Sequence, residues 1–110
     1  MSYRIKTIPH FDNEVKRIAK KHKGIKSDIE KLIENLEKNP AIGTELGKNI
    51  YKIRLAISGT NKGKSGGARV ITCVVVVSEI VYLTEIYLKS ERDTVDIAIV
   101  IQRLKDNGVI

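Results

Sequence analysis

The sequence predicts an α+β fold in which helices pack on a mainly antiparallel sheet. Two stretches near the N-terminus, residues 11–23 and 25–38, repeat apolar residues at the three- and four-residue spacing of amphipathic helices. Three later stretches, residues 51–57, 68–77 and 80–87, carry the alternating or β-branched apolar patterns typical of strands. Because no helical stretch separates these three strands, we expect them to pair as an antiparallel meander.

The N-terminal elements are expected to be a strand followed by a helical hairpin. Residues 3–8 alternate apolar and polar side chains and predict a short first strand. Phe11 and Ile18 lie on one face of the first helix, and the second helix is expected to end at Asn39, because the residue before Pro40 disfavours the helical conformation. Only a short Lys-Gly link separates the two helices, so both are expected to pack on the sheet.

The strand at residues 51–57 indicates which side of the sheet faces the helices. Its apolar residues alternate with Lys52 and Arg54, which are therefore expected to point away from that packing. Residues 41–49, just before it, contain glycine and are expected to form a loop. A last helix over residues 95–105 completes the predicted order β-α-α-β-β-β-α.

Length and composition restrict the class of protein. The chain has 110 residues, which predicts a single domain spanning residues 1–110. Its apolar runs are far shorter than the roughly 18 residues that a membrane span needs, and its N-terminus lacks the apolar core of a signal peptide. We therefore expect a cytoplasmic protein that does not enter a membrane. A single cysteine excludes an internal disulfide.

The positive charge is concentrated in two segments. The chain carries 20 Lys and Arg against 13 Asp and Glu, a formal charge of +7. Residues 15–27 and residues 46–78 contain basic residues but no acidic residue, and the two segments together account for the whole excess. Such segregation can build a positive field over one face, which would suit an acidic partner such as a nucleic acid.

The second basic segment is expected to bring five cations together. A hairpin between the strands at 51–57 and 68–77 places the end of one beside the start of the other. The glycine-rich connection between them allows close backbone approach to a ligand, and phosphate is the natural counter-charge. The five residues are Lys52, Arg54, Lys62, Lys64 and Arg69. The alternative is a solvated surface whose lysines maintain solubility.

Tyr87 and Lys89 form a second candidate pair at the end of the third strand of the meander. They are two positions apart, so both can project to one side. A tyrosine can stack on a base, and a lysine whose pKa is depressed can transfer a proton. The alternative is a tyrosine packed in the core and an ordinary surface lysine.

Other residues with potential chemistry lack the pattern that such chemistry needs. His10 and His22 have no cysteine or carboxylate partners at the spacing of a metal site, and Cys73 lies in an apolar strand where a small buried hydrophobe is expected. Neither a phosphate-binding glycine motif nor a pair of acids suited to two divalent metals occurs. We expect neither a metal nor a small-molecule cofactor.

Three stretches resemble the RelE/ParE superfamily of toxins from bacterial type II toxin–antitoxin modules, and specifically its HigB-like branch. They are NPAIGTELGKNIYKIRLA at residues 39–56, KGKSGGARVI at residues 62–71 and IYLKSE at residues 86–91. The similarity extends over essentially the whole chain. It implies a RelE-like fold and a ribosome-dependent, metal-free mRNA endoribonuclease, whose partners are a cognate antitoxin, mRNA on the ribosome and ribosomal RNA.

The resemblance also implies roles for individual residues. Matching family positions suggest phosphate contact for Lys52, Arg54 and Lys62, and a part in catalysis for Arg69, Lys64, Tyr87 and Lys89. In the implied reaction the ribose 2′-OH attacks the adjacent phosphate and the 5′-oxygen leaves. Two alternatives stay open: a ParE-like inhibitor of DNA gyrase, and a non-catalytic member that binds RNA or the ribosome. Glu85 departs from the family pattern by adding a charge to the last strand.

Overall fold

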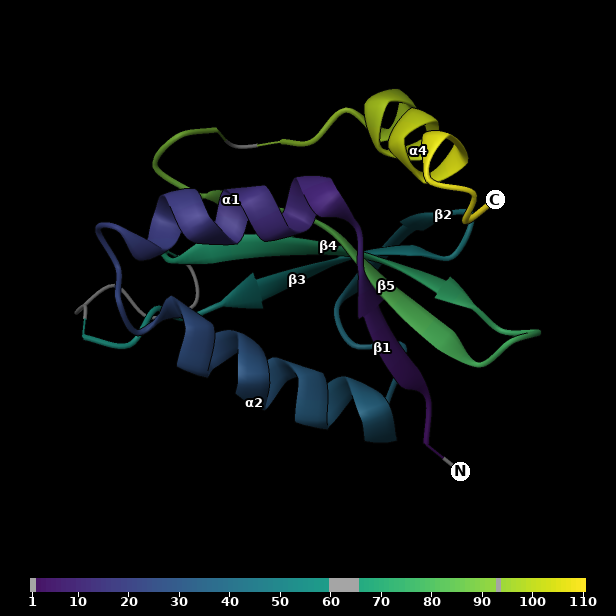
Figure 1. Cartoon of the computed structure of the whole chain (residues 1–110), viewed down its shortest axis with the longest axis horizontal. Helices are drawn as coiled ribbons and strands as arrows, with labels where there is room; N and C mark the ends of the chain where they lie inside the picture. The colour runs from purple at the N-terminus through teal and green to yellow at the C-terminus, as the bar shows by residue number, and fades with distance from the viewer. Residues whose placement is uncertain (1, 60–65, 93) are drawn as a thin grey trace.

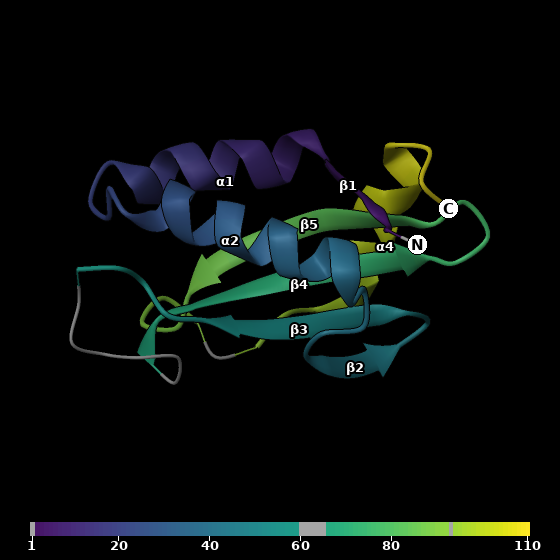
Figure 2. The ribbon, with the colours of Figure 1, turned by 90° about the horizontal axis from the view of Figure 1, so that it is seen from below.

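The computed structural model describes residues 2–59, 66–92 and 94–110. Its helices and strands follow the order β1 (Arg4–Thr7), α1 (Pro9–Ala19), α2 (Ile25–Lys38), β2 (Thr44–Gly47), β3 (Ile50–Leu55), β4 (Ala68–Val75), β5 (Ile80–Leu88) and α4 (Ile97–Asp106). Helices α1 and α2 lie over one face of a twisted sheet and α4 over the other (Figures 1 and 2). The predicted α+β fold is confirmed.

The larger core lies between the sheet and the helix pair α1 and α2. Helix α1 begins with a proline in its first turn, where the missing N–H leaves no bond unmade, and it buries Phe11 and Ile18. Helix α2 ends at Lys38, and Asn39 is already extended, as the following proline requires. The strands supply the other side of this core with Ala68, Val70, Val74, Val81, Leu83 and Ile86. The predicted helical hairpin on an apolar sheet face is confirmed.

The sheet has the strand order β1-β5-β4-β3-β2. Strands β3, β4 and β5 pair antiparallel as the predicted meander, and β1 pairs parallel with β5 at one edge. The opposite edge differs from the prediction, because residues 44–47 form the short strand β2 where a loop over 41–49 was expected. Its residues are mostly exposed and show no apolar alternation, and the left-handed conformations of Lys48 and Asn49 turn the chain into β3.

Several predicted boundaries are corrected by the structure. Helix α1 ends at Ala19, not at residue 23, because the Lys21 and His22 N–H groups both turn back to the Ile18 carbonyl. Strand β3 ends at Leu55, not at residue 57. Strand β4 ends at Val75, not at residue 77, because the chain turns away from the sheet and leaves Val77 99% exposed although its side chain is β-branched. The last helix begins at Ile97, not at residue 95, because the Asp96 side chain accepts a hydrogen bond from the Ala98 N–H at 2.9 Å and caps the helix there.

Helix α4 makes the smaller core on the other sheet face. Val100 and Leu104 pack against Ile50, Ile71 and Cys73. This face, called the α4 face below, carries the candidate site. Among the described residues, none of the helices is long and apolar enough to cross a membrane.

Candidate nucleic-acid interface

Side chains on the α4 face form three rows across β3, β4 and β5, as the strand register shows. The first row, at the start of β3, contains Ile50, Cys73 and Tyr82. The second row contains Lys52, Ile71 and Glu85. The third row contains Arg54, Arg69 and Tyr87. The first row is apolar and the third begins with two arginines directly opposite each other. Charge therefore rises along this face, and we call Lys52, Arg54 and Arg69 its cationic end.

The three residues of the cationic end differ in their exposure. Arg54 is exposed and Lys52 is half-buried, so both can reach a ligand directly. Arg69 is only 5% exposed, and its Nη1 donates to the Ala68 carbonyl at 3.1 Å. Its charge lies beneath the surface. Arg69 therefore adds to the positive potential of this region more than it provides direct contacts with a ligand.

A hollow of about 650 Å³ adjoins the cationic end, where β2 meets β3. Lys52 and Arg54 line it together with Ile42, Gly43, Thr44, Leu46 and Ile53. Gly43 adopts a φ of +100°, and a Cβ atom at this position would lie 2.4 Å from the Lys52 carbonyl oxygen. Glycine is therefore required here for the chain to pass so close to β3.

A β-bulge in β5 brings Glu85 and Tyr87 to the α4 face. Ile71 pairs with Glu85 while Thr72 pairs with Leu83, so Thr84 is an extra residue in β5. The Thr84 hydroxyl donates to the Ile71 carbonyl at 2.9 Å and stabilises the bulge. Without the extra residue, every side chain after Thr84 would face the opposite side of the sheet.

Tyr87 is covered in this structure. It is 1% exposed, and the Arg92 guanidinium lies over its ring at 4.5 Å from the ring centre. The ring face that was expected to receive a base thus already carries a guanidinium. Lys89 is half-buried just beyond β5, and its backbone N–H donates to the Gly67 carbonyl at 2.9 Å, which joins the end of β5 to the start of β4.

Lys62 and Lys64 lie outside the described residues, and a side chain of α2 holds the chain at Ser58, just after β3. The Asp28 side chain, 7% exposed in the first turn of α2, accepts the Ser58 N–H at 2.8 Å and also accepts the Ser58 hydroxyl. Helix α2 therefore fixes the chain just after β3. The sequence alone gave no sign that Asp28 would have this role.

Glu85 lies at the centre of a charged cluster that the sequence analysis did not anticipate. Its carboxylate is buried and accepts hydrogen bonds from Arg92 and, at 2.8 Å, from Arg103 of α4. The His10 Nε2 atom of α1 lies 3.5 Å from Oε1. Burial favours the protonated form, but the hydrogen bond from Arg92 and the charge of Arg103 outweigh it and hold the pKa of Glu85 below its usual range. In the sequence, the sign of this cluster was a charged residue inside an otherwise apolar strand.

The remaining candidates have structural roles. Cys73 is buried, as expected, and burial raises the pKa of its thiol, which makes it a poor nucleophile. His22 is half-buried in the connection between α1 and α2. Over the ranges that the structure describes, His, Cys, Asp and Glu side chains form no group of three or more that could hold a metal ion.

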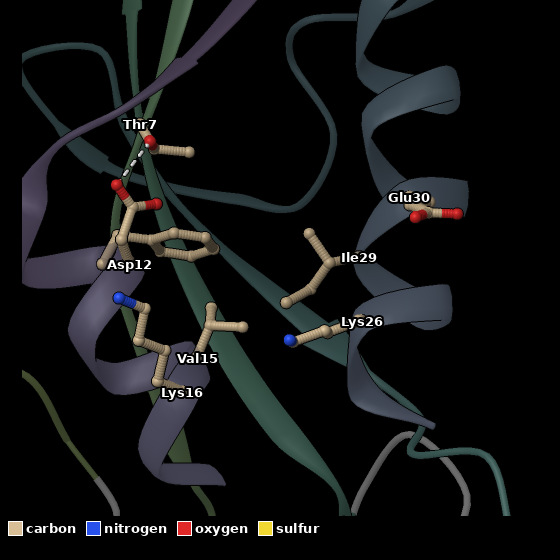
Figure 3. A pocket seen from close by; sticks show the side chains of 8 residues that line it. Thr7, Asp12, Val15, Lys16, Lys26, Ile29 and Glu30 are labelled. Atoms are coloured by element: carbon tan, nitrogen blue, oxygen red, sulfur yellow. Dashed lines mark hydrogen bonds between the residues drawn. The ribbon is translucent and has the colours of Figure 1, made fainter. Parts of the chain in front are cut away.

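A second hollow, of about 460 Å³, separates α1 from α2 on the other side of the sheet (Figure 3). Phe11, Val15 and Ile29 provide apolar walls, and its rim carries both signs of charge. The Thr7 hydroxyl donates to Asp12 Oδ2 at 3.1 Å across one end. Its balanced charge distinguishes this hollow from the cationic end.

Comparisons with known proteins agree with this fold. A family profile described as the RelE toxin of the RelE/RelB toxin–antitoxin system matches residues 10–103. No curated protein sequence gives a significant match. Among solved structures, a mutant of the E. coli toxin RelE in the free state is similar, with a TM-score of 0.60, 14% identity, and coverage of 97% of this chain and 98% of that one. The RelE-like fold is thereby confirmed, and the chain belongs to the RelE toxin family.

Proposed function

We propose that this protein is the toxin of a toxin–antitoxin pair and that it cleaves mRNA on the ribosome. Its membership of the RelE toxin family supports the toxin role. The observation that carries the RNA-directed activity is the cationic end of the α4 face, where Arg54 lies directly opposite Arg69 with Lys52 in the adjacent row. The exposed Arg54 can contact a phosphate group directly, and the buried charge of Arg69 beside it adds to the positive potential there.

The proposed reaction needs a base, an acid and positive charge near the scissile phosphate. The 2′-OH loses its proton and its oxygen attacks phosphorus, while the bond to the 5′-oxygen breaks and that oxygen gains a proton. We assign phosphate contact to Lys52, Arg54 and Lys62, and stabilisation of the developing charge to Arg69 and Lys64. Tyr87 and Lys89 complete the proposed site at the end of β5.

The same surface suggests how an antitoxin would act. A positive patch attracts a negative partner, so we propose that a cognate antitoxin presents acidic residues to the cationic end. Occupation of Arg54 and Lys52 by carboxylates would exclude RNA phosphates from the same donors. RNA and antitoxin would then compete for one surface.

The test compares two exposed arginines on well-separated strands of the sheet, Arg54 on β3 and Arg4 on β1. Arg54→Ala removes a proposed phosphate contact. Arg4→Ala removes an exposed arginine from β1, which is separated from β3 by strands β5 and β4. After a brief pulse of expression, mapping of mRNA 5′ ends by primer extension should show new ends for the wild type and for Arg4→Ala. The Arg54→Ala variant should produce them about tenfold less efficiently, which corresponds to the loss of one hydrogen bond to a charged group.

Two outcomes would contradict the proposal. Growth arrest with intact mRNA and induced DNA damage would indicate a gyrase inhibitor. Salt-sensitive RNA binding without any new ends would indicate a binding protein, the alternative that the covered Tyr87 ring favours. If the protein binds single-stranded RNA, Arg54→Ala should make the plot of log binding constant against log salt concentration less steep by about 0.7, because one phosphate contact is lost.

A further inference from the structure

Glu85 connects three parts of the chain beside the proposed site. Arg92 belongs to the segment between β5 and α4, Arg103 to α4, and His10 to the first turn of α1. All three place a nitrogen at the Glu85 carboxylate, whose side chain is 2% exposed. A carboxylate buried to this degree is stable only with such partners, so the cluster constrains the position of each of them.

Arg92 is the partner that Glu85 holds against the site. Its guanidinium is bonded to Glu85 through Nη2 and lies over the Tyr87 ring, 4.5 Å from the ring centre. Tyr87 in turn is in the row of Arg54 and Arg69. Two independent contacts, an ion pair at one edge and an aromatic ring beneath, therefore define where this guanidinium lies.

The rest of the Arg92 side chain remains available for a ligand. The side chain is 43% exposed. Within the part of the chain that the structure describes, Glu85 is the one side-chain acceptor bonded to it, which leaves Nε and Nη1 to donate elsewhere. These N–H groups are the donors that a phosphate could use.

We propose that Glu85 is a positioning residue that fixes Arg92 over Tyr87, so that the remaining N–H groups of Arg92 contact the RNA phosphate. This inference rests on the proposed ribonuclease function for the identity of the anion. Fixing a long side chain before the ligand arrives removes an ordering cost from binding and places charge where it develops in the reaction.

The first test is spectroscopic and independent of activity. Side-chain protons of Arg92 lie over an aromatic ring, so their NMR signals should be shifted upfield in the wild type. Glu85→Gln should return them to the positions of an unstacked arginine. The matched control is Glu91→Gln, since Glu91 also bonds an arginine, Arg17, at 2.7 Å, but is exposed and lies outside the cluster; it should retain the shift. An unchanged Arg92 shift in Glu85→Gln overturns the proposal.

A second pair of variants protects this test against misfolding. If Glu85→Gln alone does not fold, the combination of Glu85→Gln with Arg103→Met removes one cation together with the lost anion. It is compared with Arg103→Met alone, which leaves the bond between Glu85 and Arg92 in place. The combined variant should lose the upfield shift and the single one should keep it; retention in both overturns the proposal.

The second test links Glu85 to Arg92 through activity. Glu85→Gln should lower the rate of RNA cleavage about tenfold in the wild type but not further in an Arg92→Ala background. Equal losses in both backgrounds would show that Glu85 acts on the fold and not through Arg92. If the wild type cleaves no RNA while the NMR shift still depends on Glu85, the proposed function fails and the positioning of Arg92 by Glu85 stands.

Discussion

The contact between Asp28 and Ser58 allows a quantitative test of how α2 supports the site. Asp28 accepts the Ser58 N–H at 2.8 Å and the Ser58 hydroxyl with its other oxygen, and it is 7% exposed. A hydrogen bond to a charged acceptor contributes about 1.5 kcal/mol at the lower end of its range. We therefore predict that Asp28→Ala lowers the free energy of unfolding by about 3 kcal/mol.

Two milder variants separate the contributions. Asp28→Asn can still accept the Ser58 N–H with its oxygen and donate to the Ser58 hydroxyl with its amide, so it should lose only the charge, about 1 kcal/mol. Ser58→Ala removes one of the two bonds and should cost about 1.5 kcal/mol. Combined with Asp28→Ala, it should add almost nothing, because the partner is already absent.

Urea unfolding followed by circular dichroism measures these values, and thermal unfolding provides a check. A loss of 3 kcal/mol should lower the Tm by about 12 °C, at roughly 4 °C per kcal/mol for a chain of this length. The reasoning fails if Asp28→Ala unfolds within 0.5 kcal/mol of the wild type. It also fails if Asp28→Asn costs as much as Asp28→Ala.

Three further predictions concern stability and reactivity. Gly43→Ala should lower the free energy of unfolding by about 2 kcal/mol more than Gly47→Ala. Both positions have a φ near +100°, but only at Gly43 would the new Cβ meet backbone, at 2.4 Å from the Lys52 carbonyl oxygen. Equal losses for the two variants in chemical denaturation would contradict this. The pKa of Glu85 is lowered on folding, so its stabilisation is present above the unfolded-state pKa of about 4.3 and is lost as the pH falls through the folded value. Stability profiles from pH 7 to pH 3 should thus fall more steeply for the wild type than for Glu85→Gln. Alkylation of Cys73 should be about 100-fold slower in the native protein than in urea, since the thiol is buried and its pKa raised.

The sequence predicted those elements whose apolar residues recur at a regular spacing. Phe11 and Ile18 identified α1, and the alternation around Lys52 identified β3 and the side to which that lysine points. Strand β2 escaped prediction because its pairing depends on backbone bonds to β3 and on a left-handed turn at Lys48 and Asn49, neither of which leaves an apolar pattern.

Parts of the candidate site depend on contacts between distant residues, which a one-dimensional pattern does not reveal. The extra residue Thr84 decides that Tyr87 faces α4, yet in the sequence it is an ordinary β-branched residue within a predicted strand. Arg92 looks like an ordinary surface cation until the fold places it on the Tyr87 ring and against Glu85. The candidates from sequence therefore included the cations on the strands but not the ion pairs of Glu85 with Arg92 and Arg103.

The position of Glu85 explains how an apolar core and a cationic surface share one sheet face. Helix α4 can cover the row of Ile50 with Val100 and Leu104, but covering Arg54 would bury an exposed charge, which costs far more than apolar burial returns. The row between them contains Glu85, whose carboxylate bonds Arg103 of α4 on one oxygen and Arg92 on the other. One ionised group, the Glu85 carboxylate, thus joins the part of the sheet face that α4 covers to the part where a phosphate would bind.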